Sequence, residues 1–134
     1  FVPLSAPSTV HCPILKEVAK DYVALHQLPT EPPVGVEFFS GATGLTYGLS
    51  RDAAAGAILA QAIDTVDFVR VIETAYRNGV RRFLEIGPGS SCTKLIDEIL
   101  GERPHWAGTL APVTADPVAH AFRTLAALIE HGVP

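Results

Sequence analysis

The chain has 134 residues, of which 48% are hydrophobic, and a formal net charge of -4 at pH 7. This length and apolar content suit one globular domain with a core and exclude bulk disorder. The mild charge, without a basic cluster, argues against a nucleic acid partner. The sequence has neither an apolar run of membrane-spanning length nor a signal peptide.

The cysteines and histidines indicate neither a disulfide framework nor a metal site. There are two cysteines, Cys12 and Cys92, and the five histidines are scattered along the chain. None of these residues has metal-ligand spacing. We therefore expect no metal, no bound cofactor, reduced thiols and a cytoplasmic protein.

A rigid loop is predicted near the start of the chain. Residues 1–5 are apolar and predict the end of a strand, and because the first residue is phenylalanine we expect a piece of a longer protein. The next loop places His11 between Pro7 and Pro13, which fix φ and remove backbone donors. A side chain on such a loop is held still, and imidazole exchanges a proton near neutral pH. His11 is therefore a candidate catalytic base, with an ordinary surface histidine as the alternative.

Apolar periodicity predicts helices and strands in alternation along the rest of the chain. Helices are expected over 14–28, over 53–63 with Ser50 or Asp52 as the N-cap, from 68 to Asn78-Gly79, between Ser91 and Gly101, and from Asp116-Pro117 to Gly132. Strands are expected over 34–39, buried on both faces and followed by a glycine-rich loop, over 80–86, and over 106–110 at an edge. This order indicates an α/β fold with a mostly parallel sheet flanked by helices, part of which lies upstream.

The stretch from Gly87 to Cys92 joins a predicted strand to a predicted helix and is a second candidate site. A tight turn before a helix N-terminus has the geometry of an anion site. It does not match the G-x-S-x-G nucleophile elbow, because no serine stands between two glycines. The alternative is a structural turn in which Ser90 or Ser91 caps the helix. Glu85, at the end of the strand, is either a catalytic carboxylate or one satisfied by nearby backbone N–H groups.

Four stretches, in order, resemble the malonyl-CoA:ACP transacylase family, in particular the acyltransferase domains of type I polyketide and polyunsaturated-fatty-acid synthases. They are Ser8 to Leu15 around His11, Val34 to Gly44, Gln61 to Phe68, and Gly79 to Gly89. The last stretch, with its Glu-x-Gly-Pro-Gly signature, is the most specific, whereas Thr65 stands where proline is usual in the third.

The resemblance implies roles for five residues. In the family, a serine takes an acyl group from CoA and passes it to the phosphopantetheine thiol of an acyl carrier protein. His11 matches the base that activates both nucleophiles, and a backbone carbonyl, here that of Gln61, orients this base. Val10, and less directly Thr9 and Ser8, would border the acyl pocket. Val10 is neither the phenylalanine nor the serine that usually accompanies malonyl or methylmalonyl choice in the family, and malonyl is the expected group.

The resemblance also implies a domain division and a missing part. Residues 1–111 would be the C-terminal part of an acyltransferase domain, mainly its large α/β-hydrolase-like subdomain, with 1–5 ending the small ferredoxin-like subdomain and 112–134 forming a linker with a helix. No G-H-S-x-G motif occurs, so the serine, and the arginine that pairs with the malonyl carboxylate, are expected upstream.

The expected substrates and partners are acyl-CoA (malonyl-CoA in the first place), an acyl carrier protein and the upstream half of the domain. A non-catalytic module that docks a carrier protein or a neighbouring domain is the alternative. A small anion or nucleotide binder, using Gly87 to Ser91, is a third reading of the sequence.

Overall fold

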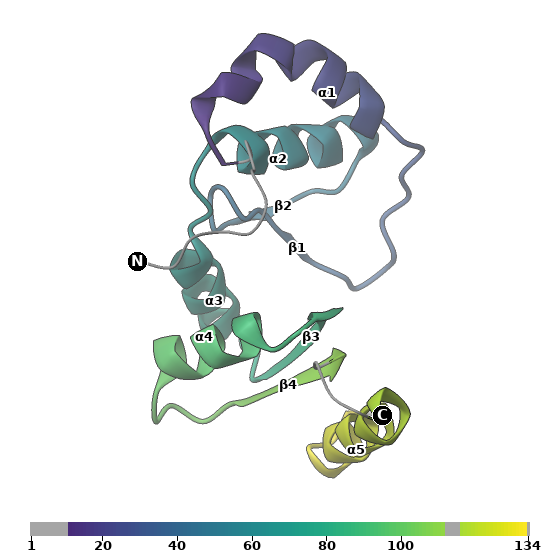
Figure 1. Cartoon of the computed structure of the whole chain (residues 1–134), viewed down its shortest axis with the longest axis vertical. Coiled ribbons are helices and arrows are strands. Elements are labelled where there is room, and N and C mark those ends of the chain that lie inside the picture. The colour runs from purple at the N-terminus through teal and green to yellow at the C-terminus, as the bar shows by residue number, and fades with distance from the viewer. Residues whose placement is uncertain (1–10, 112–115, 134) are drawn as a thin grey trace. The chain divides into compact units, whose positions relative to one another are not determined.

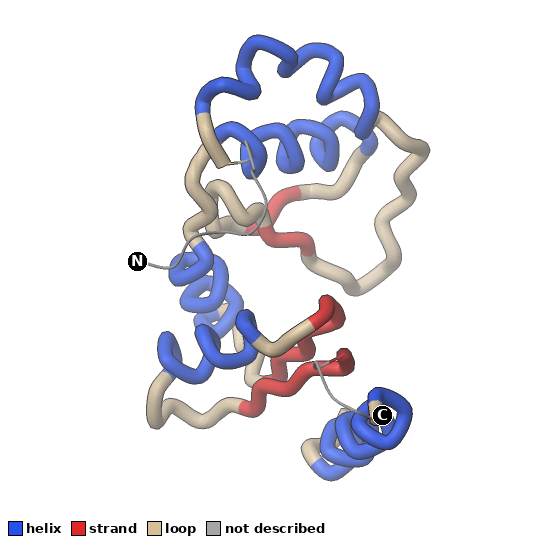
Figure 2. Tube along the Cα trace, viewed as in Figure 1, coloured by secondary structure: helices blue, strands red, loops and turns tan. Residues whose placement is uncertain are grey.

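The structure is a computed structural model that describes residues 11–111 and 116–133. It divides into two compact units, Phe1–Thr74 and Ala75–Pro134, called the N-terminal and the C-terminal unit below. Both mix helices with short strands (Figure 1, Figure 2), which confirms the predicted α/β class. Of the two described strand pairs, one is antiparallel and one is parallel. None of the described helices is both long and apolar enough to cross a membrane.

The N-terminal unit is built on packed helices. A 3-10 helix, η1 (Pro13–Val18), leads into α1 (Ala19–His26), and both pack on α2 (Arg51–Ile63), as Figure 1 shows. The single helix predicted over 14–28 is thus two helical segments that end earlier than expected. The next helix along the chain, α3 (Phe68–Arg77), spans the boundary between the two units.

The strand predicted over 34–39 is much shorter in the structure. Only Phe38–Phe39 (β1) is a strand, and it pairs with Thr46–Tyr47 (β2), which lies in the predicted glycine-rich loop. Residues Pro33 to Val36 form a turn closed by a 3.4 Å N–H···O bond between its ends, and Gly35 has a φ of 76°. A glycine with positive φ at the third position is typical of a type II turn. The predicted burial is also wrong, because both valines of this turn are exposed.

The C-terminal unit is a strand–helix–strand unit with one further helix. β3 (Arg82–Pro88) and β4 (Trp106–Ala111) are parallel, and α4 (Ser91–Leu100) connects them, as a parallel pair requires. α5 (Pro117–Glu130) packs on β4. The strands predicted over 80–86 and 106–110 are therefore present with small shifts of their ends.

The local signals at several helix ends are confirmed. The hydroxyl of Ser50 and the carboxylate of Asp116 accept hydrogen bonds from backbone N–H groups in the first turns of α2 and α5, at 3.2 and 2.9 Å. Gly79, Gly101 and Gly132 follow α3, α4 and α5 with φ values of 95°, 56° and 76°. Glycine adopts this left-handed region at low cost, which is why it ends these helices.

Little apolar surface is buried within the described residues. The buried apolar residues are Ala55, Ala62, Ile72, Ala75, Ile96 and Leu100. On α5, by contrast, an apolar stripe is exposed. It is called the α5 stripe below and consists of Val118, Phe122, Leu125 and Ile129, which are 46% to 69% exposed.

Candidate functional site

His11 lies immediately before η1, at the C-terminal end of α2. Its backbone N–H donates to the carbonyl of Ala62 at 2.6 Å, and the N–H of Cys12 donates to the same oxygen at 3.3 Å. The last carbonyls of a helix have no partner within the helix, so they are available to bind a neighbouring loop. His11 has a φ of 61°, the only positive φ among the described non-glycine residues. The loop is therefore fixed by backbone bonds in a conformation that few side chains adopt.

The imidazole of His11 is oriented by the backbone carbonyl of Gln61, one residue before Ala62 in α2. Its Nδ1 lies 2.6 Å from the carbonyl oxygen of Gln61. Because a carbonyl only accepts, Nδ1 must carry the proton in this contact. In the neutral ring, Nε2 then has a free lone pair, as a general base requires. This is the contact that the family resemblance implies, and it joins residues 50 positions apart.

A cavity of about 240 Å³ opens beside this ring. Its lining residues are His11, Tyr22, Ile58, Gln61 and Ala62. Three of these residues, Tyr22, Ile58 and Ala62, are not predicted from the sequence as site residues. Ile58 is three and four positions before Gln61 and Ala62, so helical spacing places it on the same face of α2 and could have indicated it. The contribution of Tyr22, from α1, depends on packing between helices that no local pattern specifies.

A glycine-containing loop supports Gln61 from another side. A Cβ atom on Gly41 would lie 2.9 Å from Oε1 of Gln61, so the loop backbone approaches this side chain closely. The carbonyl of Gly41 accepts a hydrogen bond from the N–H of Asp67 at 3.0 Å, and the N–H of Gly44 donates to the carbonyl of the buried Ser40 at 2.8 Å. These bonds close the loop that follows β1 and tie it to the segment between α2 and α3.

The second candidate site, at the start of α4, is occupied by a side chain of the chain itself. The carboxylate of Glu85 accepts bonds from the backbone N–H groups of Thr93 and Cys92, at 2.9 and 3.3 Å, and from the Thr93 hydroxyl at 2.8 Å. The bond from the Thr93 N–H is the main cause that lowers the pKa of Glu85 below its ordinary value of 4.5. Ser90 is at the N-cap position but its side chain makes no capping bond. Glu85 takes that role instead.

The glycine turn before α4 is also tied to the sheet. The N–H of Gly89 donates to the carbonyl of Ala111 at 2.8 Å, and the hydroxyl of Thr109 donates to the carbonyl of Gly89 at 2.7 Å. The carboxylate of Glu85 accepts from two of the backbone N–H groups at the start of α4, and the turn is hydrogen-bonded to β4. The geometry therefore favours the structural interpretation of Gly87 to Cys92 over an anion site.

The remaining predicted site residues lie outside the described residues. Ser8, Thr9 and Val10 precede residue 11, so their place near an acyl pocket stays a prediction. Among the described residues, no group of three or more histidine, cysteine, aspartate or glutamate side chains could hold a metal ion. Neither Cys12 nor Cys92 takes part in a disulfide, and both are half-buried.

No protein-family model matches the chain. A subunit of the polyunsaturated fatty acid synthase of Thraustochytrium sp. (strain ATCC 26185 / S-3) is 26% identical to it over 144 residues, an alignment that takes in 99% of this chain and 7% of that protein.

Two solved structures share its fold. The acyltransferase domain from the second module of the salinomycin polyketide synthase superposes with a TM-score of 0.81 at 20% identity, over 98% of this chain and 30% of that one. Malonyl CoA-acyl carrier protein transacylase from Clostridium perfringens superposes with a TM-score of 0.73 at 25% identity, over 98% of this chain and 39% of that one. The resemblance inferred from the motifs is thereby confirmed, and the chain corresponds to well under half the length of each of these three proteins.

Proposed function

We propose that this chain is the C-terminal part of an acyltransferase that moves a malonyl-type acyl group from CoA to an acyl carrier protein through a serine acyl-enzyme. The observation that carries the proposal is the 2.6 Å contact between Nδ1 of His11 and the carbonyl of Gln61. It leaves Nε2 as the proton acceptor beside a cavity. The similarity to acyltransferase structures supports the same role.

The chemistry takes two transfers. The serine, supplied by a segment outside these 134 residues, gives its proton to Nε2 of His11 while its oxygen attacks the thioester carbonyl. The CoA sulfur leaves and takes a proton from the ring. In the second transfer, the phosphopantetheine thiol gives its proton to Nε2 and attacks the acyl-serine ester, and the serine oxygen takes a proton from the ring. Within each transfer, after it has taken one proton and before it returns it, the ring is a cation at the C-terminal end of α2, where the helix favours positive charge.

The substrates of this reaction are acyl-CoA and the phosphopantetheine arm of the carrier protein, and the chain needs no bound cofactor. Val10, Thr9 and Ser8 directly precede the base and would border the acyl group, with malonyl as the preferred one. Malonyl-CoA and carrier proteins are cytoplasmic partners, and we place the protein there.

The test is an intact-mass measurement after incubation with malonyl-CoA. We expect no adduct on this chain alone, and an adduct on an acyltransferase segment that carries G-H-S-x-G when this chain is present. His11→Asn should abolish that adduct, and asparagine is chosen because it tolerates a positive φ. His26→Asn is the matched control, because His26 also has Nδ1 on a carbonyl, at 2.7 Å, and does not line the cavity. A malonyl adduct on this chain alone would contradict the proposal.

A second candidate, a non-catalytic module that docks a carrier protein or a neighbouring domain, is favoured by the exposed α5 stripe. Binding of a carrier protein to this chain alone, unchanged by His11→Asn and lost in Phe122→Asp, would favour this module over the acyltransferase.

A further inference from the structure

A cavity of about 400 Å³ lies at the amino ends of β3 and β4. Its lining residues are Arg81, Arg82, Pro104, His105, Trp106 and His131, and it is called the cationic cavity below. Arg82 and Trp106 begin the two strands and are direct partners in the sheet register. Four of the six lining side chains can carry positive charge and none is acidic, in a chain whose formal net charge is -4. The lining of this cavity is therefore basic although the chain as a whole is acidic.

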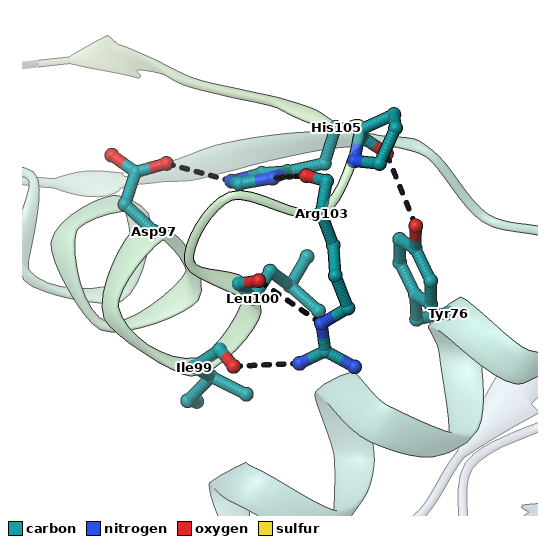
Figure 3. Close-up of polar contacts among 7 residues, drawn as sticks. Tyr76, Asp97, Ile99, Leu100, Arg103 and His105 are labelled. Carbon is teal, nitrogen blue, oxygen red and sulfur yellow. Dashed lines mark hydrogen bonds and ion pairs between the residues drawn. The ribbon is translucent and has the colours of Figure 1, made fainter.

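Two of the four basic side chains are held in place by the protein. The guanidinium of Arg81 donates to the carbonyl of Tyr76 at 2.6 Å and lies 3.7 Å from the centre of the Tyr76 ring. His105 has Nδ1 2.7 Å from the carbonyl of Arg103 and Nε2 3.0 Å from the carboxylate of Asp97, as Figure 3 shows. These two contacts fix the orientation of the His105 ring at the cavity wall.

The other two basic side chains have unused donors. Arg82 and the ring of His131 make no hydrogen bond or ion pair with any residue of 11–111 or 116–133. The His131 ring lies against Trp106, with 5.8 Å between ring centroids. An unpaired guanidinium and an imidazole thus face one cavity beside an indole.

A structural role for Arg82 at the C-terminal end of α5 does not account for this arrangement. Arg82 does lie beside Gly132, 3.6 Å from the place a Cβ atom would take there. Two carbonyls in the last turn of α5 are already bonded, because Gly132 and Val133 donate to Ile129 and Leu128, at 2.9 Å each. This is the usual closure of a helix that ends at glycine, and it needs no arginine.

We propose that the cationic cavity binds a phosphate monoester whose organic part is flat and apolar. The planar fork of the Arg82 guanidinium matches two phosphate oxygens, and His131 supplies a further donor. Trp106 and Pro104 form an apolar wall on which a ring can lie. The volume falls within the range of about 300–1,000 Å³ typical of small-molecule sites. Arg81 adds positive charge from a fixed position, and His105 is held at the cavity wall by its contacts with Arg103 and Asp97.

The chain contains a single tryptophan, and it lines this cavity, so its fluorescence reports binding directly. We expect a saturable change in Trp106 fluorescence on titration of the 134-residue chain with phenyl phosphate, and a weaker affinity for inorganic phosphate, which lacks the ring. Arg82→Gln should weaken phenyl phosphate binding about tenfold or more, the effect of losing hydrogen bonds to a charged group. Arg82→Lys should weaken binding less, because it keeps the charge and loses the fork.

A control variant outside the cavity and a second variant inside it complete this test. Arg123→Gln removes the same charge from an exposed position on α5 outside the cavity and should leave affinity unchanged. His131→Gln replaces an exposed side chain at the helix end and should weaken binding without unfolding, which circular dichroism checks. Equal weakening by Arg123→Gln, or no saturable signal with either phosphate compound, would overturn the proposal. So would binding of a poly-glutamate peptide in place of phenyl phosphate, which would assign the cavity to an acidic protein partner.

Discussion

Two helix ends in this molecule each hold a titratable side chain, and they do so with opposite polarity. At the C-terminal end of α2, backbone carbonyls bind the backbone and the ring of His11. At the N-terminal end of α4, backbone N–H groups bind the carboxylate of Glu85. Each helix end binds the kind of group that complements it, because terminal carbonyls accept from a donor and terminal N–H groups donate to an acceptor.

The two side chains differ in how many of their polar atoms remain available for chemistry. The ring of His11 gives one nitrogen to the helix and keeps the other for chemistry, next to a cavity. The carboxylate of Glu85 accepts three hydrogen bonds and serves the start of α4. A helix end can therefore orient a side chain and leave it free to react, or satisfy most of its hydrogen-bonding capacity for a structural purpose. The number of hydrogen bonds that the side chain makes to the helix distinguishes the two cases.

Replacing His11 should have the largest effect on function. In a protein that joins this chain to its serine-bearing part, His11→Asn should lower the rate of acyl transfer about 10²- to 10⁴-fold, the usual contribution of a general base. Carrier-protein acylation measured over time gives the rate, with His26→Asn as the control. A rate within a few fold of the parent would mean that His11 is not the base.

Replacing Glu85 should instead change stability. Glu85→Ala removes the acceptor at the start of α4 and should lower the free energy of unfolding by about 1 kcal/mol, within the range for helix caps and reduced by the partial exposure of the carboxylate. Urea denaturation measures it, with the exposed Glu98→Ala as the control. If acyl transfer fell without any loss of stability, Glu85 would belong to the active site and the contrast with His11 would fail.

The same carboxylate should also make stability depend on pH, an effect smaller than that of removing the side chain. Hydrogen bonding holds the pKa of Glu85 below 4.5 in the folded chain, so the folded state binds the proton less readily than the unfolded state. The stabilisation is therefore complete above pH 4.5 and is lost as the pH falls through the lower, folded pKa. The difference in Tm between the parent and Glu85→Gln should shrink as the pH is lowered below 4.5. A difference that is constant with pH would contradict the assignment.

The smallest effect is expected at Gln61. Its backbone carbonyl orients His11 and persists in any substitution, so Gln61→Ala should change the rate of acyl transfer by only a few fold. Acyl-transfer rates of Gln61→Ala and His11→Asn, measured in the same assay, separate the backbone role of Gln61 from the side-chain role of His11. A loss at Gln61 as large as that at His11 would show that the side chain takes part.

Features coded within a few residues could be predicted from the sequence. The caps at Ser50 and Asp116 and the glycine ends at Gly79 and Gly132 depend on neighbours in the chain, and they are as expected. The strand expected over 34–39 is wrong because Gly35 lies within an apolar run that resembles a strand, although the turn it forms is itself a local signal.

Contacts between distant residues could not be obtained from local patterns. The bond between His11 and Gln61 spans 50 positions and is expected only from the family resemblance. Tyr22 escapes prediction as a lining residue of the same cavity because its place depends on how α1 packs on α2. The cationic cavity likewise combines the starts of two strands with the end of α5, and no sequence spacing indicates that combination.

The parallel pair of β3 and β4 has a consequence for handling the protein. Within the described residues the sheet has two strands, so each strand has one edge whose backbone donors and acceptors are unpaired, and Ile86 on β3 is 74% exposed. Such edges recruit further strands, from a natural partner or from neighbouring copies. A preparation of this chain alone should scatter more light as it is concentrated. Co-expression with the segment that completes the sheet should raise the soluble yield and extend storage life.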